Sequence, residues 1–200
     1  MIKKHLDKIL ISLGCIIIII AILLKVNTEY QQKKIVNDYR EEIKDMERQD
    51  ISFNKPKDDL KIDQTQKQSS KTIGILSIPK IDLSVGIGEG VDKETLKYSV
   101  GHFPQTAMPG KNGNMCIIGH RSYAYGEFFN RLDEVGKNDY IIIESYGNTF
   151  KYKVTETKVV TPDEVSVLNQ TEDSEITLIT CTPIRVWSHR LIIKGVLVDD

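Results

Sequence analysis

An uninterrupted apolar run near the N-terminus constrains this chain more than any other feature. Residues 9–24 read ILISLGCIIIIIAILL, sixteen positions without a charge. As a helix the run is about 24 Å long, because each residue adds about 1.5 Å. The hydrocarbon core of a bilayer is about 30 Å thick, and Val26 and the snorkelling amines of Lys8 and Lys25 extend the run toward that length. We therefore predict a transmembrane helix over residues 9–26.

Two other interpretations of this run are a buried core helix and a cleaved signal peptide. Five consecutive isoleucines leave no polar face for a helix on the surface of a globular core. The sequence LLKVN at residues 23–27 contains no small-x-small cleavage site. An uncleaved signal anchor is the interpretation that these observations favour.

The charges that flank the run predict its orientation. Lys3, Lys4 and Lys8 precede it with only Asp7 against them, so residues 1–8 are expected to be a cytoplasmic tail. Basic residues also lie after the run and weaken this asymmetry: Lys25, Lys33 and Lys34. We expect a single-pass protein of the cell membrane, with everything after the span outside the cell.

Residues 27–70 are polar and are interpreted as an extracellular stalk, a solvated tether between the span and residues 71–200. Apolar residues recur in its first half at roughly helical spacing, which predicts an amphipathic helix: Tyr30, Ile35, Val36, Tyr39, Ile43 and Met46. Residues 52–70 are rich in Asn, Pro, Lys, Asp, Gln and Ser, which is typical of a flexible spacer.

Residues 71–200 carry the signals of a mainly β domain. Six strands are predicted, over residues 72–78, 114–118, 140–144, 149–154, 175–181 and 191–198. A short helix is predicted over residues 126–135, with one apolar face formed by Phe128, Phe129, Leu132 and Val135. So many short strands in about 130 residues indicate a closed or nearly closed β-barrel with one or two short helices. The glycines of residues 86–90 are expected to form a turn between strands.

Composition excludes several classes of function. The formal net charge is −1, so bulk positive charge does not drive this chain onto nucleic acid. Three cysteines make no disulfide framework, and no CxxC pair is present to hold a structural zinc ion. No metal ion and no cofactor are expected.

The cysteines differ in what their positions predict. Cys15 lies inside the apolar run, and Cys116 lies in the middle of a predicted strand, where burial is expected. Cys181 closes an apolar strand and is followed by Thr182 and Pro183, so its thiol is expected at a strand end, where sites are commonly built. A thiol nucleophile also needs a lowered pKa or an adjacent base.

Two residues are candidate partners of Cys181. His120 comes after the strand at residues 114–118 through one glycine, so it too is expected at a strand end. Arg190 begins the strand after Cys181, and a hairpin would bring its guanidinium beside the thiol, where it could hold a carbonyl oxygen or an oxyanion. His102 and His189 are assigned to loops, and His5 lies on the cytoplasmic side.

Several motifs, taken in order, resemble the sortase family. TLITCTP at residues 177–183, with RLII at 190–193, resembles the TLxTC…R signature of sortases. PGKNGN at residues 109–114 with IGHR at 118–121 resembles the PGxxGN…GHR segment, and IPKI at 78–81 resembles the opening strand of the family. The resemblance implies the sortase β-barrel over residues 71–200 as a catalytic domain.

The resemblance also implies roles for individual residues. Cys181 would be the nucleophile, His120 the acid and base, Arg190 the group that holds the oxyanion or the substrate, and Thr180 a residue lining the substrate groove. Sortases cut an LPxTG-like sorting signal between Thr and Gly and pass the acyl group to an amine of the cell wall or, in pilus sortases, of a pilin. The expected partners are therefore LPxTG-type surface proteins, a cell-wall precursor or peptidoglycan amine, and the membrane.

The subclass is inferred from the segments that accompany the motifs. TCTP after the nucleophile resembles the pilus-building and class D groups. The sequence shows neither a DPW-like lid motif nor a second hydrophobic span, so class D-like anchoring is expected. A cysteine peptidase that gives its thioacyl intermediate to water and a catalytically silent binding module remain as alternatives; the Cys181, His120 and Arg190 set argues against the silent module.

Overall fold

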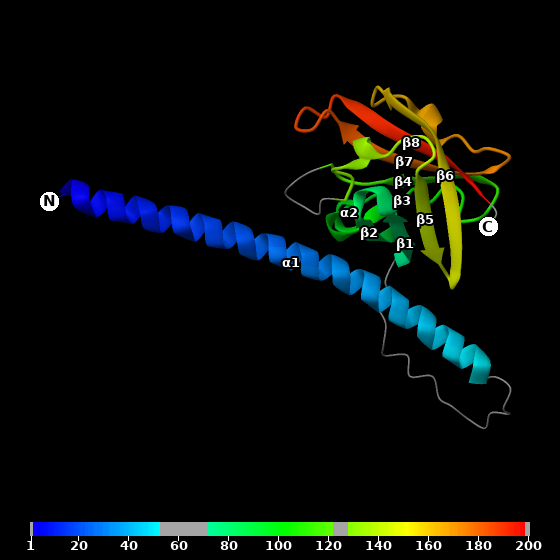
Figure 1. Cartoon of the computed structure of the whole chain (residues 1–200), viewed down its shortest axis with the longest axis horizontal. Helices are drawn as coiled ribbons and strands as arrows, with labels where there is room; N and C mark the ends of the chain where they lie inside the picture. The colour runs from blue at the N-terminus through cyan, green and yellow to red at the C-terminus, as the bar shows by residue number, and fades with distance from the viewer. Residues whose placement is uncertain (1, 53–71, 122–127, 199–200) are drawn as a thin grey trace.

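A long N-terminal helix lies against a β-barrel (Figure 1). The computed structural model describes residues 2–52, 72–121 and 128–198, with side chains from residue 8 to 46 in the first of these segments. Helix α1 (Ile2–Ser52) is continuous through the apolar run and the first part of the predicted stalk. None of its most apolar stretch is buried, which rules out the buried core helix. In the described part of the chain it is the one helix long and apolar enough to cross a membrane.

The barrel closes through eight strands within the described residues. These are β1 (Thr72–Ile78), β2 (Leu83–Glu89), β3 (Val100–His102), β4 (Gly113–Ile118), β5 (Tyr140–Ser145), β6 (Asn148–Val160), β7 (Ser174–Thr182) and β8 (His189–Leu197). Their order around the barrel is β1-β2-β3-β4-β7-β8-β6-β5, closed by β5 against β1. The pairs β2–β3 and β4–β7 are parallel and the others antiparallel. The predicted closed β-barrel is confirmed.

Alternate residues of the strands fill the interior of the barrel. Leu76, Ile87, Ile117, Leu178 and Ile193 each come from a different strand and are fully buried in one cluster. This period of two is the one expected when one face of each strand points inward. A second set of apolar side chains covers the outer face of β7 and β8: Val167, Ile179, Ile192, Phe103, Ile118, Val160 and Leu168.

Three expectations from the sequence are wrong. Residues 86–89 lie in β2 and do not form a turn. Gly86 and Gly88 are located where side chains of α1 and of helix α2 (Lys93–Tyr98) approach the strand. A Cβ on Gly86 would lie 2.6 Å from Cγ2 of Ile35, and one on Gly88 would lie 2.5 Å from Cγ2 of Thr95. Glycine inside a strand commonly marks such a close approach.

The predicted helix over residues 126–135 is also corrected. Residues 128–130 form a turn, and η2 (Leu132–Glu134) is a single turn of 3-10 helix; residues 126 and 127 lie outside the described residues. Leu132 N–H donates to Phe129 O at 3.3 Å, and Val135 N–H donates to Leu132 O at 3.2 Å, the three-residue spacing of a 3-10 turn. The four predicted apolar residues are nevertheless buried, as their spacing indicated.

The third correction concerns the two histidines assigned to loops. His102 ends β3 and is fully buried, with Nδ1 2.9 Å from Oε2 of Glu89 and Nε2 3.1 Å from the carbonyl oxygen of Ala107. His189 begins β8, where it pairs with Thr182. A three-residue strand such as β3 is too short to produce a recognisable period in the sequence, so its histidine could not be placed.

The first half of the predicted stalk is helical, as its periodicity indicated, but it is more than a tether. Val36 and Tyr39 are buried against Ile75 of β1, and Ile43 packs beside them. The Tyr39 hydroxyl donates to Ile73 O at 3.2 Å and accepts from Tyr146 N–H at 2.9 Å. The helix is therefore docked on the barrel. The predicted flexible spacer after residue 52 lies outside the described residues.

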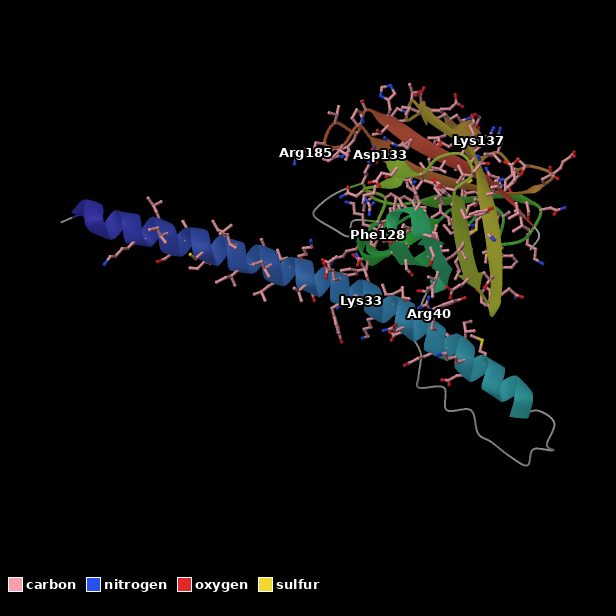
Figure 2. The ribbon with its side chains drawn as sticks, viewed as in Figure 1. Lys33, Arg40, Phe128, Asp133, Lys137 and Arg185 are labelled. Carbon is pink, nitrogen blue, oxygen red and sulfur yellow. The ribbon has the colours of Figure 1, made fainter. Side chains whose placement is uncertain are left out.

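An ion pair joins the same two elements. Arg40 Nη2 lies 3.1 Å from Oε1 of Glu144 on β5, and both side chains are partly exposed (Figure 2). Exposed pairs of this kind contribute about 0–1 kcal/mol. The buried tyrosine and its two hydrogen bonds, rather than the ion pair, therefore fix the helix in place.

We expect Tyr39→Phe to lower the free energy of unfolding by about 1–2 kcal/mol, because it leaves the Tyr146 N–H without its partner. Urea unfolding of the full chain in detergent micelles, followed by near-ultraviolet circular dichroism, measures the change. Tyr30→Phe on the same helix is the control, since Tyr30 is 63% exposed and should change stability by less than about 0.5 kcal/mol. Equal stability of the two variants would show that the helix is not held through Tyr39.

Candidate active site

The parallel pairing of β4 with β7 places His120 level with Cys181. The register runs Ile117 with Leu178 and Ile118 with Ile179. His120 lies two residues beyond Ile118, and Cys181 lies two beyond Ile179. Gly119 N–H donates to Ile179 O at 3.1 Å, so the pairing continues past the end of β4. Two segments far apart in sequence therefore end side by side.

The β7–β8 hairpin places Arg190 directly opposite Cys181, as the sequence predicted. Along β7, Leu178 points into the barrel core, while Ile179 belongs to the apolar cluster outside it. Because side chains alternate along a strand, Cys181 lies on the same outer face as Ile179, and Arg190 lies beside it on the same face as Ile192. Cys181 and Arg190 are both half-buried, and His120 is exposed.

Arg190 is oriented by the backbone around it. Its Nη1 donates to the carbonyl oxygens of His189 at 3.0 Å and Trp187 at 3.2 Å. Among the described residues both of its hydrogen bonds come from this one nitrogen, which leaves the Nε and Nη2 donors of the fork for another oxygen.

Thr180 is placed differently from the expectation that it lines the groove. It is fully buried, and its Oγ1 donates to Gly119 O at 2.8 Å. It alternates with Cys181 and so faces the interior of the barrel. The position suits a residue that holds the segment bearing His120 against β7.

Arg121 is a structural member of the site that the sequence left unassigned. Its side chain is buried, with Nη2 2.7 Å from Oδ1 of Asp133 and Nη1 donating to Oγ1 of Thr182 at 2.9 Å. It therefore joins the residue after His120 to the residue after Cys181. Its place beside His120 in the GHR segment was the one available signal, and it did not indicate burial or partners.

An apolar groove runs along the outer face of the barrel and reaches the arginine. It has a volume of about 250 Å³ and is lined by Phe103, Ile118, Val160, Pro162, Glu164, Val165, Val167, Leu168, Ile179, Arg190 and Ile192. A larger hollow of about 560 Å³ lies between α1 and the barrel, around Gln32, Asp82 and Asn130. The groove, although smaller, is the better candidate of the two for a substrate site, because its lining includes Arg190, which lies opposite Cys181.

Cys116 contrasts with Cys181. It is fully buried in β4, and burial raises the pKa of its thiol to about 12. It therefore stays protonated and unreactive in the folded protein at any physiological pH. The predicted burial of this thiol is confirmed.

Comparison with known proteins places the fold in a family. The family model for the sortase domain matches residues 76–198. This chain belongs to the sortase family. It is 36% identical to Sortase D of Bacillus subtilis (strain 168) over 118 residues, 58% of this chain and 57% of that protein. It is 30% identical to Sortase A of Listeria monocytogenes over 125 residues, 62% of this chain and 56% of the relative. The match thus spans somewhat more than half the length of these relatives.

Solved sortase structures share the architecture. A Clostridium perfringens Sortase D5 transpeptidase superposes with a TM-score of 0.67 at 30% identity, covering 85% of this chain and 99% of that one. Sortase A from Corynebacterium diphtheriae superposes with a TM-score of 0.62 at 39% identity, covering 64% of this chain and 61% of the other. The sortase barrel predicted from the motifs is therefore confirmed.

We expect iodoacetamide at pH 8 to label Cys181 but not Cys116 in the folded full-length chain, and to label both in urea. Cys116 is expected to resist the reagent because its raised pKa keeps the thiol neutral in the folded state. The same raised pKa makes the stability of the fold decrease as pH rises from about 9, where the unfolded thiol ionises, through about 12. Mass spectrometry of the peptides measures the labelling. Labelling of folded Cys116 at the rate of Cys181 would contradict this assignment.

Proposed function

We propose that this chain is a membrane-anchored sortase that cleaves an LPxTG-like sorting signal between Thr and Gly and transfers the acyl group to an amine of the cell wall. The observation that carries the proposal is the register that ends β4 and β7 together, with His120 level with Cys181 and Arg190 opposite the thiol. Similarity to Sortase D and Sortase D5 supports a class D-like anchoring enzyme over a pilus-building one.

The proposed reaction uses each of the three groups in turn. The Cys181 thiolate attacks the carbonyl carbon of the signal's Thr, and the Arg190 fork holds the oxyanion that forms. His120 gives a proton to the departing Gly amine, which leaves a thioester on Cys181. An incoming amine then transfers a proton to His120 and attacks the thioester. The new amide leaves, and the thiolate returns.

The groove on the outer face of β7 and β8 supports this assignment of substrate. Its lining is mostly apolar and includes Arg190, which suits a short extended peptide with Leu and Pro at one end and a scissile bond at the other. Among the described residues that line it, Glu164 is the one that is acidic. The leucine of the signal is expected to contact the cluster around Ile179 and Ile192.

The anchor and its orientation belong to the same proposal. Helix α1 carries the exposed apolar stretch, and basic residues precede it, so the N-terminus is assigned to the cytoplasm and the barrel to the outer surface of the cell. In this arrangement residues 1–8 are the tail, 9–26 the span, 27–70 the connection and 71–200 the catalytic domain.

The test is incubation of the full chain, in lipid nanodiscs, with LPxTG-type peptides and amine acceptors, followed by mass spectrometry of the products. The full chain is needed because Tyr39 of α1 bonds to the barrel. Water is present at about 55 M, so a millimolar amine wins only if a site orients it. We expect Cys181→Ala to abolish cleavage and transfer, Cys116→Ala to keep both, and a suitable amine to raise turnover and to appear in the product.

Two outcomes would overturn parts of this proposal. Free acid as the sole product with every amine tried would indicate a cysteine peptidase. Activity in Cys181→Ala together with inactive but folded Cys116→Ala would reverse the assignment of the nucleophile.

We expect Arg190→Lys to lower kcat about 10²–10³-fold although the charge is kept, because a lysine amine cannot reproduce the planar fork while also holding the Trp187 and His189 carbonyls. Arg131→Lys is the matched control, since Arg131 is half-exposed and paired with Glu134 outside the site. Steady-state turnover of a fluorogenic signal peptide measures both. Near-normal turnover of Arg190→Lys would mean that Arg190 acts through charge alone or lies outside the reacting centre.

A further inference from the structure

The connection between β7 and β8, residues 183–188, carries apolar side chains that are exposed on the surface. Val186 is 65% exposed, Trp187 is 56% exposed, and Arg185 between Ile184 and Val186 is exposed as well. Trp187 is the only tryptophan of the chain. Tryptophan beside an aliphatic residue and an arginine is the composition of a membrane–water interface, where the ring is amphipathic and the guanidinium meets phosphate.

Backbone hydrogen bonds close the loop and join it to the candidate site. Arg185 and Trp187 have φ values of 70° and 57°, in the left-handed region that residues other than glycine seldom adopt. Val186 N–H and Trp187 N–H both donate to Pro183 O, at 3.2 and 3.0 Å. The Trp187 carbonyl in turn accepts from Nη1 of Arg190. The loop therefore shares a hydrogen bond with the arginine of the candidate site.

The length of α1 between the predicted span and the barrel gives the distance of the barrel from the bilayer. The predicted span ends at Val26, and Gln32 already lines a hollow shared with Asp82 and Asn130 of the barrel domain. Six helical residues separate them, or about 9 Å. The headgroup layer on each side of a bilayer is about 5–8 Å thick, the difference between the full bilayer and its hydrocarbon core. The barrel side that faces Gln32 therefore lies at the outer edge of the headgroups.

The loop lies on the membrane side of that contact. In Figure 1 the orange connection between β7 and β8 is at the end of the barrel directed along α1 toward its N-terminal half, and Figure 2 labels Arg185 at this end. The turn between β5 and β6 lies on the other side, where Tyr146 bonds to Tyr39. Docking through Val36 and Tyr39 keeps the barrel from turning this end away.

We propose that residues 183–188 rest in the headgroup layer of the outer leaflet, with Val186 and Trp187 at the interface and Arg185 on lipid phosphate. This inference rests on the membrane anchoring that is part of the proposed function. It commits to a phospholipid surface because α1 brings that surface to the loop, and because the loop offers one cation and two apolar groups to it. The end of the barrel that carries Cys181 then faces the bilayer.

The fluorescence of Trp187 distinguishes a side chain in contact with lipid from one exposed to water. The full chain is placed in nanodiscs of phosphatidylglycerol and phosphatidylcholine, which leave both leaflets open to aqueous reagents. Fluorescence quenching by iodide is compared with quenching by lipids that carry a nitroxide at the headgroup or high on the acyl chain. We expect strong quenching of Trp187 by the lipid nitroxides and at least threefold weaker iodide quenching than in the control.

The control moves the tryptophan to a surface of equal exposure far from the lipid. Tyr146 is 58% exposed, and it is bonded to Tyr39, thirteen residues or about 20 Å beyond Val26 along α1. In the Trp187→Phe, Tyr146→Trp double variant we expect free access to iodide and no lipid quenching. Equal iodide quenching at the two positions, with no lipid quenching at Trp187, would overturn the proposal and leave the loop as a surface for a protein partner.

A second pair of variants tests whether the side chains themselves make the contact. Val186→Glu should weaken quenching of Trp187 by the nitroxide lipids at least twofold, because a carboxylate is repelled by lipid phosphate. Val159→Glu is the matched control, since Val159 is a 58% exposed valine on β6, and it should leave quenching unchanged. Identical behaviour of the two variants would contradict a contact made by residue 186.

Two independent measurements separate this inference from the function on which it rests. Resistance to carbonate extraction from native membranes reports the anchor, and the peptide transfer assay reports the activity. A carbonate-resistant, active protein whose Trp187 escapes lipid quenching overturns the loop contact and leaves the sortase proposal standing. Lipid-quenched Trp187 in a protein that transfers no peptide supports the contact and overturns the proposed activity. Extraction by carbonate overturns the anchor and the contact together.

Discussion

The parallel pairing of β4 with β7 assembles the candidate site. It brings together two strand ends that lie far apart along the chain, and it sets His120 level with Cys181. The hairpin from β7 to β8 then adds Arg190 across from the thiol. Parallel strands need a long connection between them, and here that connection consists of β5, β6 and their loops, which complete the barrel. The strands that close the barrel are therefore the same strands that bring the site together.

Buried polar contacts hold this arrangement where strand pairing stops. Thr180 donates to Gly119 O on one side of the strand end, and Arg121 bridges Asp133 and Thr182 on the other. A buried arginine is tolerated only when its donors are satisfied, so removing any of these acceptors is costly. The reacting groups on the outer face remain half-buried or exposed, which a substrate requires. The site thus combines a rigid inner layer with accessible outer side chains.

Helix α1 joins the barrel to the apolar stretch that is proposed to span the membrane. Gly86 gives Ile35 room to approach β2, and Tyr39 bonds to two backbone groups of the barrel. In the proposed anchoring, the docked helix sets the distance of the candidate site from the bilayer and the direction in which the site points. A flexible tether would leave both undetermined, and the exposed loop that contains Trp187 would have no defined neighbour.

Local sequence patterns were enough to predict the apolar helix, six of the eight strands found in the described residues, the burial of Cys116 and the hairpin that returns Arg190 to Cys181. Each of these depends on a hydrophobic period or on a few residues that end a strand. The burial of His102, the partners of Arg121, the inward face of Thr180 and the docking of α1 became apparent only in the folded chain. These depend on contacts between segments far apart in sequence, and a short strand or a glycine in β2 carries no local period that reveals what packs against it.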